Sequence, residues 1–184
     1  MNKILLNNKS IYPSKVACIG RNYSEHIKEL NNEVPSQMVF FIKPNSSISS
    51  NIVFPKAHNS CHYEAEISFL IEEGKISAVG FGLDLTLREV QSKLKEKGLP
   101  WERAKSFDGA SVFSDFVPFN DDITKLGLEL YINDELKQKG DVSLMINKPL
   151  EIIDEFQTFA SFEDGDILMT GTPKGVGEFK VGDV

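Results

Sequence analysis

Three carboxylates, at Glu64, Glu66 and Asp84, are the side chains in this sequence most able to do chemistry together. Alternate residues of an extended strand point the same way, so Glu64 and Glu66 are expected on one face. The segment 73–75 predicts a short hairpin turn between this strand and the next. If the turn contains those three residues, Asp84 lies directly opposite Glu64 and diagonally from Glu66. Such a concentration of negative charge predicts a bound cation.

Two other interpretations of these carboxylates remain open from the sequence. The solvent-facing side of any antiparallel strand alternates in the same way, and this is the commoner meaning of Glu-Ala-Glu. A two-residue turn would slip the register by one and bring Asp84 to the other face. Asp84 nonetheless stands between two leucines, where strand propensity alone does not place an aspartate.

The ligand type narrows the choice of cation. Three carboxylates offer only oxygen, which suits Mg²⁺, Mn²⁺ or Ca²⁺. Zn²⁺ more often recruits histidine or cysteine, so it is disfavoured, although His62 is expected on the same strand face.

Bulk composition predicts one compact domain over residues 1–184, with 41% hydrophobic and 26% charged residues. The net charge of −7 argues against nonspecific binding to nucleic acid or to an anionic membrane. Cys18 and Cys61 form no CxxC pair, which predicts neither a disulfide framework nor a structural zinc site and fits the cytoplasm. No apolar run approaches the length of a membrane span.

Short strands and inserted helices are predicted to position these side chains. Strand patterns are followed by helix-opening patterns at Asn22 and Thr86, each a capping box with a glutamate three residues later. The expected strands lie at 15–20, 39–44 and 167–170, with hairpins around 73–75 and 133–135. The expected helices run from about 23 to 30, 87 to 97 and 146 to 159, whereas 101–119 is expected to be mostly irregular. This order predicts a mixed, largely antiparallel α+β fold.

Six motifs in one order resemble the fumarylacetoacetate hydrolase family, from Val16 to the last residue. They are Gly20-Arg21-Asn22-Tyr23, Phe41-Ile42-Lys43-Pro44, His62-Tyr63-Glu64-Ala65-Glu66, Leu83-Asp84-Leu85-Thr86, Gly98-Leu99-Pro100-Trp101 with Ala104-Lys105-Ser106-Phe107-Asp108, and Thr170-Gly171-Thr172-Pro173-Lys174-Gly175-Val176-Gly177. The sequence is most similar to the small single-domain subgroup of acylpyruvate hydrolases and oxaloacetate-acting enzymes. The resemblance implies a β-roll of the family's C-terminal-domain type with short inserted helices, a Mg²⁺ or Mn²⁺ site, and a homodimer.

Carried over one position at a time, the resemblance implies a role for ten residues. Glu64, Glu66 and Asp84 would be metal ligands. His26 and Glu29 would be a catalytic pair, and their i, i+3 spacing places them on one helical face. Lys105 would be an active-site lysine. The expected substrate-binding residues are Arg21, Arg88, Gln91 and Thr172, although a plain turn is an equally good interpretation of the glycine-rich loop that holds Thr172.

The sequence departs from the family pattern in two places. Glu66 and Asp84 are separated by a minimal hairpin, where family members often insert a short helix. The chain also stops at Val184, where relatives continue into at least one more strand. From the short hairpin we expect one wall of the pocket, or a dimer contact, to differ, and from the end at Val184 we expect a chain that is either naturally short or incomplete.

These observations predict a metal-dependent hydrolase that cleaves a carbon–carbon bond in acylpyruvate-type 2,4-dioxo acids through a metal-stabilised enolate. The same electron sink would serve an oxaloacetate decarboxylase or tautomerase, or a hydroxymuconate-type isomerase/decarboxylase. A non-catalytic metal-binding protein is the alternative outside enzymology.

Overall fold

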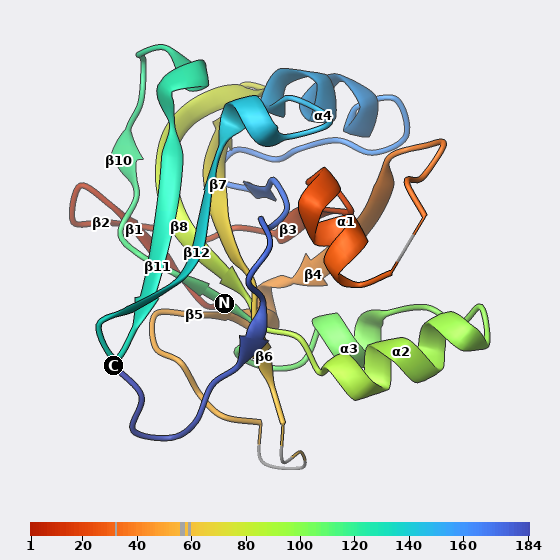
Figure 1. Cartoon of the computed structure of the whole chain (residues 1–184). Helices are drawn as coiled ribbons and strands as arrows, with labels where there is room; N and C mark the ends of the chain where they lie inside the picture. The colour runs from red at the N-terminus through yellow and green to blue at the C-terminus, as the bar shows by residue number, and fades with distance from the viewer. Residues whose placement is uncertain (32, 56–57, 59) are drawn as a thin grey trace.

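A strongly curved, mostly antiparallel sheet of eight strands dominates the computed structural model, which describes residues 1–31, 33–55, 58 and 60–184 (Figure 1). Its strands run in the order β4-β3-β13-β7-β8-β9-β5, and β10 pairs with β8. They are β3 (Lys15–Gly20), β4 (Val39–Pro44), β5 (Ile48–Ser49), β7 (Ala65–Glu72), β8 (Lys75–Asp84), β9 (Ser111–Phe113), β10 (Val117–Pro118) and β13 (Ile167–Met169). The predicted mixed α+β class is confirmed.

Three two-stranded ribbons complete the strands. They are β1 (Ile4–Leu6) with β2 (Lys9–Ile11), β6 (His62–Tyr63) with β14 (Gly177–Glu178), and β11 (Gly127–Ile132) with β12 (Glu135–Asp141).

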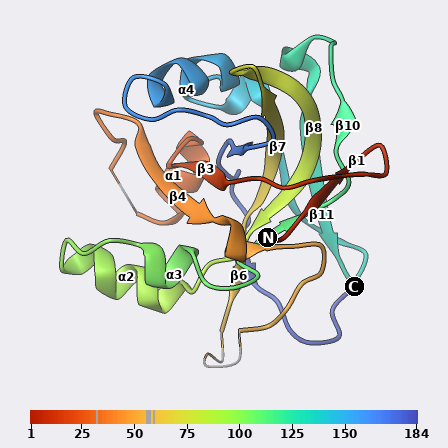
Figure 2. The ribbon, with the colours of Figure 1, turned by 180° about the vertical axis from the view of Figure 1, so that it is seen from behind.

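The helices are short and lie around the sheet. They are α1 (Ser24–Glu29), α2 (Arg88–Glu96), α3 (Glu102–Lys105) and α4 (Pro149–Phe156), with 3₁₀ turns η1 (Asn45–Ser47), η2 (Ile123–Lys125) and η3 (Val142–Leu144). Two opposite views show α1, α2 and α3 on one side of the molecule, the β11–β12 ribbon on the other, and α4 across one end (Figures 1 and 2). None of the helices in the described ranges has the length and apolar character needed to cross a bilayer.

The two faces of the central hairpin contribute to different packing clusters. Ala65, Ile67 and Phe69 join the larger core, together with Leu85 and Phe156. The alternate face packs against a smaller cluster that contains Val16, Cys18 and Met169. Alternation along the strands therefore gives the sheet two apolar sides.

In the hairpin that carries the carboxylates, Glu64 lies opposite Asp84 as predicted, but the turn differs from the predicted one. Glu73 and Gly74 both have positive φ, at 50° and 69°, and they form a two-residue turn closed by Glu72 and Lys75. The predicted three-residue turn is therefore wrong. The pairing shifts between Leu70 and Ile71, so that one extra residue in β8 forms a β-bulge. This bulge restores the register that the longer turn would have given.

The predicted capping boxes and the predicted irregular segment 101–119 also differ from the structure. Neither α1 nor α2 has a side-chain hydrogen bond at its N-cap, so both predicted capping boxes are wrong. The Asn22 amide instead donates to the Thr170 carbonyl, and the Thr86 hydroxyl donates to the Asp84 carbonyl. The segment 101–119 is also more regular than predicted, because it contains α3, β9 and β10.

Candidate active site

The three carboxylates converge at the open end of the β7–β8 hairpin. Ala65 pairs with Leu83, and the Asp84 amide donates to the Glu64 carbonyl at 2.8 Å. One carboxylate oxygen from each of Glu64, Glu66 and Asp84 lies within 4.8 Å of the other two. All three residues are at most 5% exposed, which excludes the interpretation as a solvated strand face.

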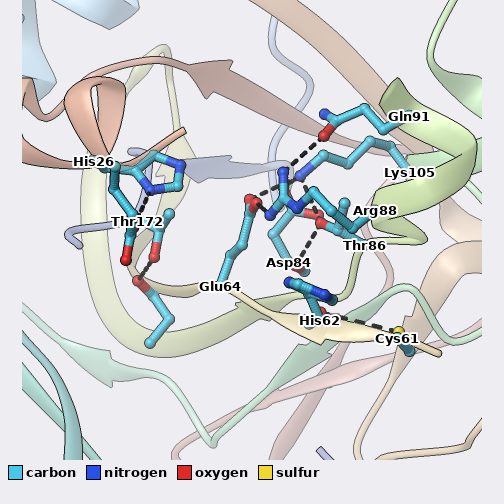
Figure 3. Close-up of polar contacts among 12 residues, drawn as sticks. His26, Cys61, His62, Glu64, Asp84, Thr86, Arg88, Gln91, Lys105 and Thr172 are labelled. Carbon is cyan, nitrogen blue, oxygen red and sulfur yellow. Dashed lines mark hydrogen bonds and ion pairs between the residues drawn. The ribbon is translucent and has the colours of Figure 1, made fainter. Parts of the chain in front are cut away.

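Cationic side chains surround part of this cluster. The buried Lys105 ammonium donates to Glu64 Oε2 at 2.7 Å, to Asp84 Oδ2 at 2.6 Å and to the Thr86 hydroxyl at 2.7 Å (Figure 3). Arg88 forms an ion pair with Glu64 and also donates to the Gln91 amide oxygen at 2.7 Å. Burial alone would lower the pKa of Lys105, but Asp84 and Glu64 outweigh it and raise this pKa. Lys105 is therefore a fixed positive charge within the cluster.

Lys43 is a site residue that the sequence reasoning missed. It is fully buried, and its ammonium lies 2.6 Å from Asp84 Oδ1 and donates to the Ala110 carbonyl at 2.7 Å. The contact between Lys43 and Asp84 Oδ1 is an ion pair whose angles lie outside the range of a hydrogen bond. The signal was a lysine inside an otherwise apolar strand, in the motif Phe41-Ile42-Lys43-Pro44.

Glu64 and Glu66 differ in how well their charge is balanced. Burial disfavours the Glu64 carboxylate, but Lys105 and Arg88 overcome it and hold the pKa of Glu64 far below its usual value. Burial, Asp84 and Glu64 together raise the pKa of Glu66 well above normal. Among the described residues, no lysine or arginine forms an ion pair with Glu66, whose Oε2 accepts one backbone hydrogen bond, from Gly171 at 2.7 Å.

This donor set fits a hard divalent cation. It offers only oxygen, it is buried, and one oxygen of each carboxylate lies within 4.8 Å of the other two. A divalent cation would also relieve the repulsion that raises the pKa of Glu66. Glu64, Glu66 and Asp84 are the residues that would hold it.

His26 and Glu29 form the expected contact on α1. His26 is 7% exposed, and its Nδ1 lies 3.1 Å from Glu29 Oε2. An ionised carboxylate only accepts hydrogen bonds, so Nδ1 carries the proton of this contact and Nε2 is the nitrogen left to exchange one. Glu29 Oε1 in turn accepts from the Gly175 amide at 2.9 Å. The Gly175 amide thus holds the carboxylate that orients the imidazole.

The glycine-rich loop at 171–177 binds site carboxylates through its backbone. Gly171 and Gly175 have φ values of 88° and 99°, which other residues rarely adopt, and a Cβ at Gly175 would lie 2.0 Å from a backbone oxygen. Their amides hold Glu66 and Glu29, respectively. The loop is therefore more than a plain turn.

Thr172 is anchored by groups outside the loop. Its hydroxyl donates to the Ala65 carbonyl at 2.9 Å and accepts from the Gln138 amide at 2.7 Å. Gln138 is 1% exposed and its side-chain oxygen also accepts from the Ala65 amide. This role of Gln138 was not predicted, because the residue lies in a strand of mainly polar residues.

One pocket collects nearly all the predicted residues. Nine of the ten line it, and only Glu29 stands behind. The predicted residues in its wall are Arg21, His26, Glu64, Glu66, Asp84, Arg88, Gln91, Lys105 and Thr172. Phe41 and Trp101 add an aromatic wall, with ring centroids 5.8 Å apart. The wall also includes Lys95, which was not predicted, although its i+4 spacing from Gln91 on α2 places both on one face.

Comparisons with known proteins agree with this geometry. A family model described as "Fumarylacetoacetate (FAA) hydrolase C-terminal" matches residues 15–184. Oxaloacetate tautomerase YcgM from Escherichia coli (strain K12) is 40% identical over 190 residues, covering 94% of this chain and 87% of that protein. A crystal structure of a protein of the fumarylacetoacetate isomerase/hydrolase type from Oleispira antarctica is 42% identical, with a TM-score of 0.92 over 100% of this chain and 91% of the other. Fumarylpyruvate hydrolase from Pseudomonas aeruginosa, solved with Mn²⁺ and pyruvate, shares the fold at 24% identity, with a TM-score of 0.89 over 99% of this chain and 88% of the other.

Proposed function

The chain belongs to the fumarylacetoacetate hydrolase family, and from that membership we propose that it is a divalent-cation-dependent oxaloacetate tautomerase. The main support for this proposal is that His26 lines the same pocket as the buried cluster of Glu64, Glu66 and Asp84. A relative that is 40% identical over nearly the whole chain has this activity in its name.

The hydrolase activity that the sequence first predicted is not confirmed. Tautomerisation was the alternative within the same prediction, and the similarity to an oxaloacetate tautomerase supports it better. Both reactions pass through an enolate of a 2-oxo acid, so the same pocket chemistry underlies both predictions.

The bound cation would act as a Lewis acid on the 2-oxo group and make the protons on C3 more acidic. In the keto-to-enol direction, His26 Nε2 removes a C3 proton while Glu29 holds Nδ1. The electron pair of the C3–H bond becomes the C2–C3 double bond, and the 2-oxygen then takes the same proton back from the His26 imidazolium, which restores the neutral imidazole. Lys105 supplies positive charge near that oxygen. The reverse sequence returns the proton to C3, so no atom is lost or gained.

Hydrolysis remains the second candidate because of the His26–Glu29 contact. An imidazole oriented by a carboxylate can equally deprotonate water for attack on the distal carbonyl of an acylpyruvate.

The deciding experiment follows three signals with purified protein and Mg²⁺ or Mn²⁺: enol absorbance of oxaloacetate, pyruvate release, and consumption of acetylpyruvate. We expect accelerated enol loss in excess of pyruvate release, abolished by EDTA and lowered about 10²- to 10⁴-fold in kcat by His26→Asn. The exposed His58 provides a matched control, and His58→Asn should retain full activity. Acetylpyruvate cleavage without enhanced tautomerisation would establish the hydrolase instead.

We also propose a cytoplasmic homodimer acting on a small 2-oxo acid, as predicted from the sequence. Light scattering after size-exclusion chromatography should give twice the mass of one chain, and a mass of one chain would contradict it.

A further inference from the structure

A lysine of β4 points into the protein at a position where an apolar side chain is the ordinary choice. Lys43 is fully buried, whereas its neighbour Ile42 is 41% exposed. Lysine is almost never buried completely unless its charge is paired, so the usual order of burial is reversed at these two positions. The Lys43 ammonium lies 2.6 Å from Asp84 Oδ1 and donates to the Ala110 carbonyl at 2.7 Å. The burial of Lys43 therefore brings its charge to a carboxylate of the candidate site.

Lys43 contacts the carboxylate cluster from behind the pocket. The wall of the pocket, so far as the structure describes it, contains Asp84, Arg88 and Lys105 but not Lys43. Arg88 and Lys105 can therefore act on a bound ligand directly. Any effect of Lys43 on such a ligand passes through the Asp84 carboxylate.

Lys43 completes a balance of charge in the cluster. Glu64 has an ion pair at each carboxylate oxygen, with Arg88 at one and Lys105 at the other. Asp84 likewise has Lys43 at Oδ1 and Lys105 at Oδ2. Three cationic side chains thus stand against the three carboxylates of the cluster. The formal charge of this buried group is zero.

A divalent cation would enter this neutral cluster against the charge of Lys43. Like charges a few ångströms apart repel more strongly in a buried site than in water, because the effective dielectric constant is lower. The ammonium also lies beside Asp84 Oδ1, so it competes with the cation for the same carboxylate. Without the charge of Lys43, the cluster would have a net negative charge and would hold a cation more tightly.

We propose that Lys43 is a positioning residue that acts through Asp84 and lowers the affinity of the cluster for a divalent cation, which keeps the cation exchangeable. An anionic ligand that chelates the cation brings the negative charge that the neutral cluster lacks. The cation is therefore retained mainly when such a ligand is bound. This inference rests on the proposed function for the cation site and for a 2-oxo acid as the ligand.

The Mn²⁺ affinity of Lys43→Met without any ligand tests the role of the charge. Methionine is nearly as long as lysine and has no charge. By calorimetry we expect the variant to bind Mn²⁺ about tenfold more tightly than the wild type, because one repelling charge is removed. A purely structural role gives the opposite sign, since Asp84 would lose a partner that holds it in place. Lys75 is the matched control, because it is exposed at the far end of the strand that carries Asp84, and Lys75→Met should leave the affinity unchanged.

The wild-type protein gives a second test, which decides the inference if Lys43→Met does not fold. The probe is pyruvate, a 2-oxo acid that can chelate a cation through its carboxylate and 2-oxo oxygens. With free Mn²⁺ measured by EPR, we expect the affinity for Mn²⁺ to rise about tenfold in saturating pyruvate. Gel filtration without pyruvate should remove the Mn²⁺.

Two results would overturn the inference. One is a folded Lys43→Met protein that binds Mn²⁺ no more tightly than the wild type. The other is a wild type whose Mn²⁺ affinity changes less than about threefold with pyruvate. These measurements require no turnover of oxaloacetate, so an enzyme that tautomerises oxaloacetate but shows either result would keep the proposed function and lose this role of Lys43.

Discussion

The substitution Glu66→Gln separates metal binding from folding, because the buried Glu66 carboxylate destabilises the folded protein when no cation is bound. Glu66 lies beside Glu64 and Asp84 without a lysine or arginine partner in the described structure. Glutamine has the same shape, and its side-chain oxygen can still accept the Gly171 hydrogen bond. We therefore expect the variant to be more stable than the wild type without metal and to bind metal more weakly.

The size of the effect follows from the spacing of the carboxylates. Two unit charges 4.8 Å apart repel by about 3.5 kcal/mol at an effective dielectric constant of about 20. Lys105 and Lys43 offset part of this repulsion, and protonation of Glu66 relieves part of the rest. We expect a net gain of about 2 kcal/mol in the free energy of unfolding.

The gain should depend on pH with a defined sign. The pKa of Glu66 is raised in the folded protein, so the folded state binds more protons than the unfolded state above the usual glutamate pKa of about 4.3. Stability of the metal-free wild type then decreases as the pH rises through this range. The variant lacks this titration, so the difference between the two proteins should widen with increasing pH.

Urea denaturation in EDTA from pH 4.5 to 8, together with Mn²⁺ titration by calorimetry, measures both effects. Mn²⁺ affinity should fall about 100-fold, since one of three anionic ligands is lost. Glu72→Gln is the matched control, because Glu72 is at the exposed end of the same strand. A metal-free variant less stable than the wild type, or a Mn²⁺ affinity within threefold of it, would refute the assignment of Glu66 as an unbalanced ligand.

Three further predictions concern the scaffold and the base. Asp166→Asn should lower the free energy of unfolding by about 3 kcal/mol at pH 7. Burial alone would raise the pKa of Asp166, but hydrogen bonds to its carboxylate outweigh burial and lower this pKa. The denaturation curves of the two proteins should therefore converge as the pH falls from about 3.9 through the lower pKa of the folded state. Deletion of Ser77, the extra residue of the bulge, should leave the Mn²⁺ affinity within about threefold of the wild type, because Asp84 stays opposite Glu64. One glycine inserted in the second half of β8 should abolish Mn²⁺ binding, because it shifts the register and turns Asp84 to the other face. Glu29→Gln should lower kcat about 10- to 100-fold by loosening His26 while leaving Mn²⁺ affinity unchanged, and a matching loss of metal affinity would contradict this role.

The strands were predictable from sequence because their apolar alternation is a local property. The turn at Glu73-Gly74 was not assigned correctly, since the pattern cannot show where the ladder absorbs an extra residue. The extra residue, Ser77, comes two residues after the strand begins, and its place is fixed by the pairing of β8 with both neighbouring strands. The prediction of opposed Glu64 and Asp84 was correct, although the turn on which it depended was wrong.

The two capping boxes were wrong for a different reason, although both helices begin within one residue of the predicted start. The patterns at Asn22 and Thr86 satisfy the local rule for a capping box. In the folded chain both side chains bind partners far away or inside the site, Asn22 with Thr170 and Thr86 with Lys105. Local propensity was overridden by tertiary hydrogen bonds that no short sequence window contains.

Residues of the candidate site were predictable where they formed a sequence motif. They were missed where they contact the site only through residues that are distant in the sequence. His26 and Glu29 share a helical face, so their contact follows from spacing alone. Gln138 contacts Ala65 and Thr172, which are 73 and 34 residues away. Its neighbours in the sequence are polar, so nothing distinguishes it from an ordinary exposed strand position.

The convergence of the site has a topological cause in the order of the central strands. β13 lies between β3, to which it is parallel, and β7, to which it is antiparallel. The ends of β3 and β13 therefore meet the beginning of β7 at one edge, and the antiparallel β8 also ends there. His26 follows β3, the glycine loop follows β13, Glu64 and Glu66 stand at the start of β7, and Asp84 ends β8. The His26 imidazole and the carboxylate cluster thus line one pocket because these four strands meet at one edge, and the amides of the glycine loop bind Glu29 and Glu66 at the same time.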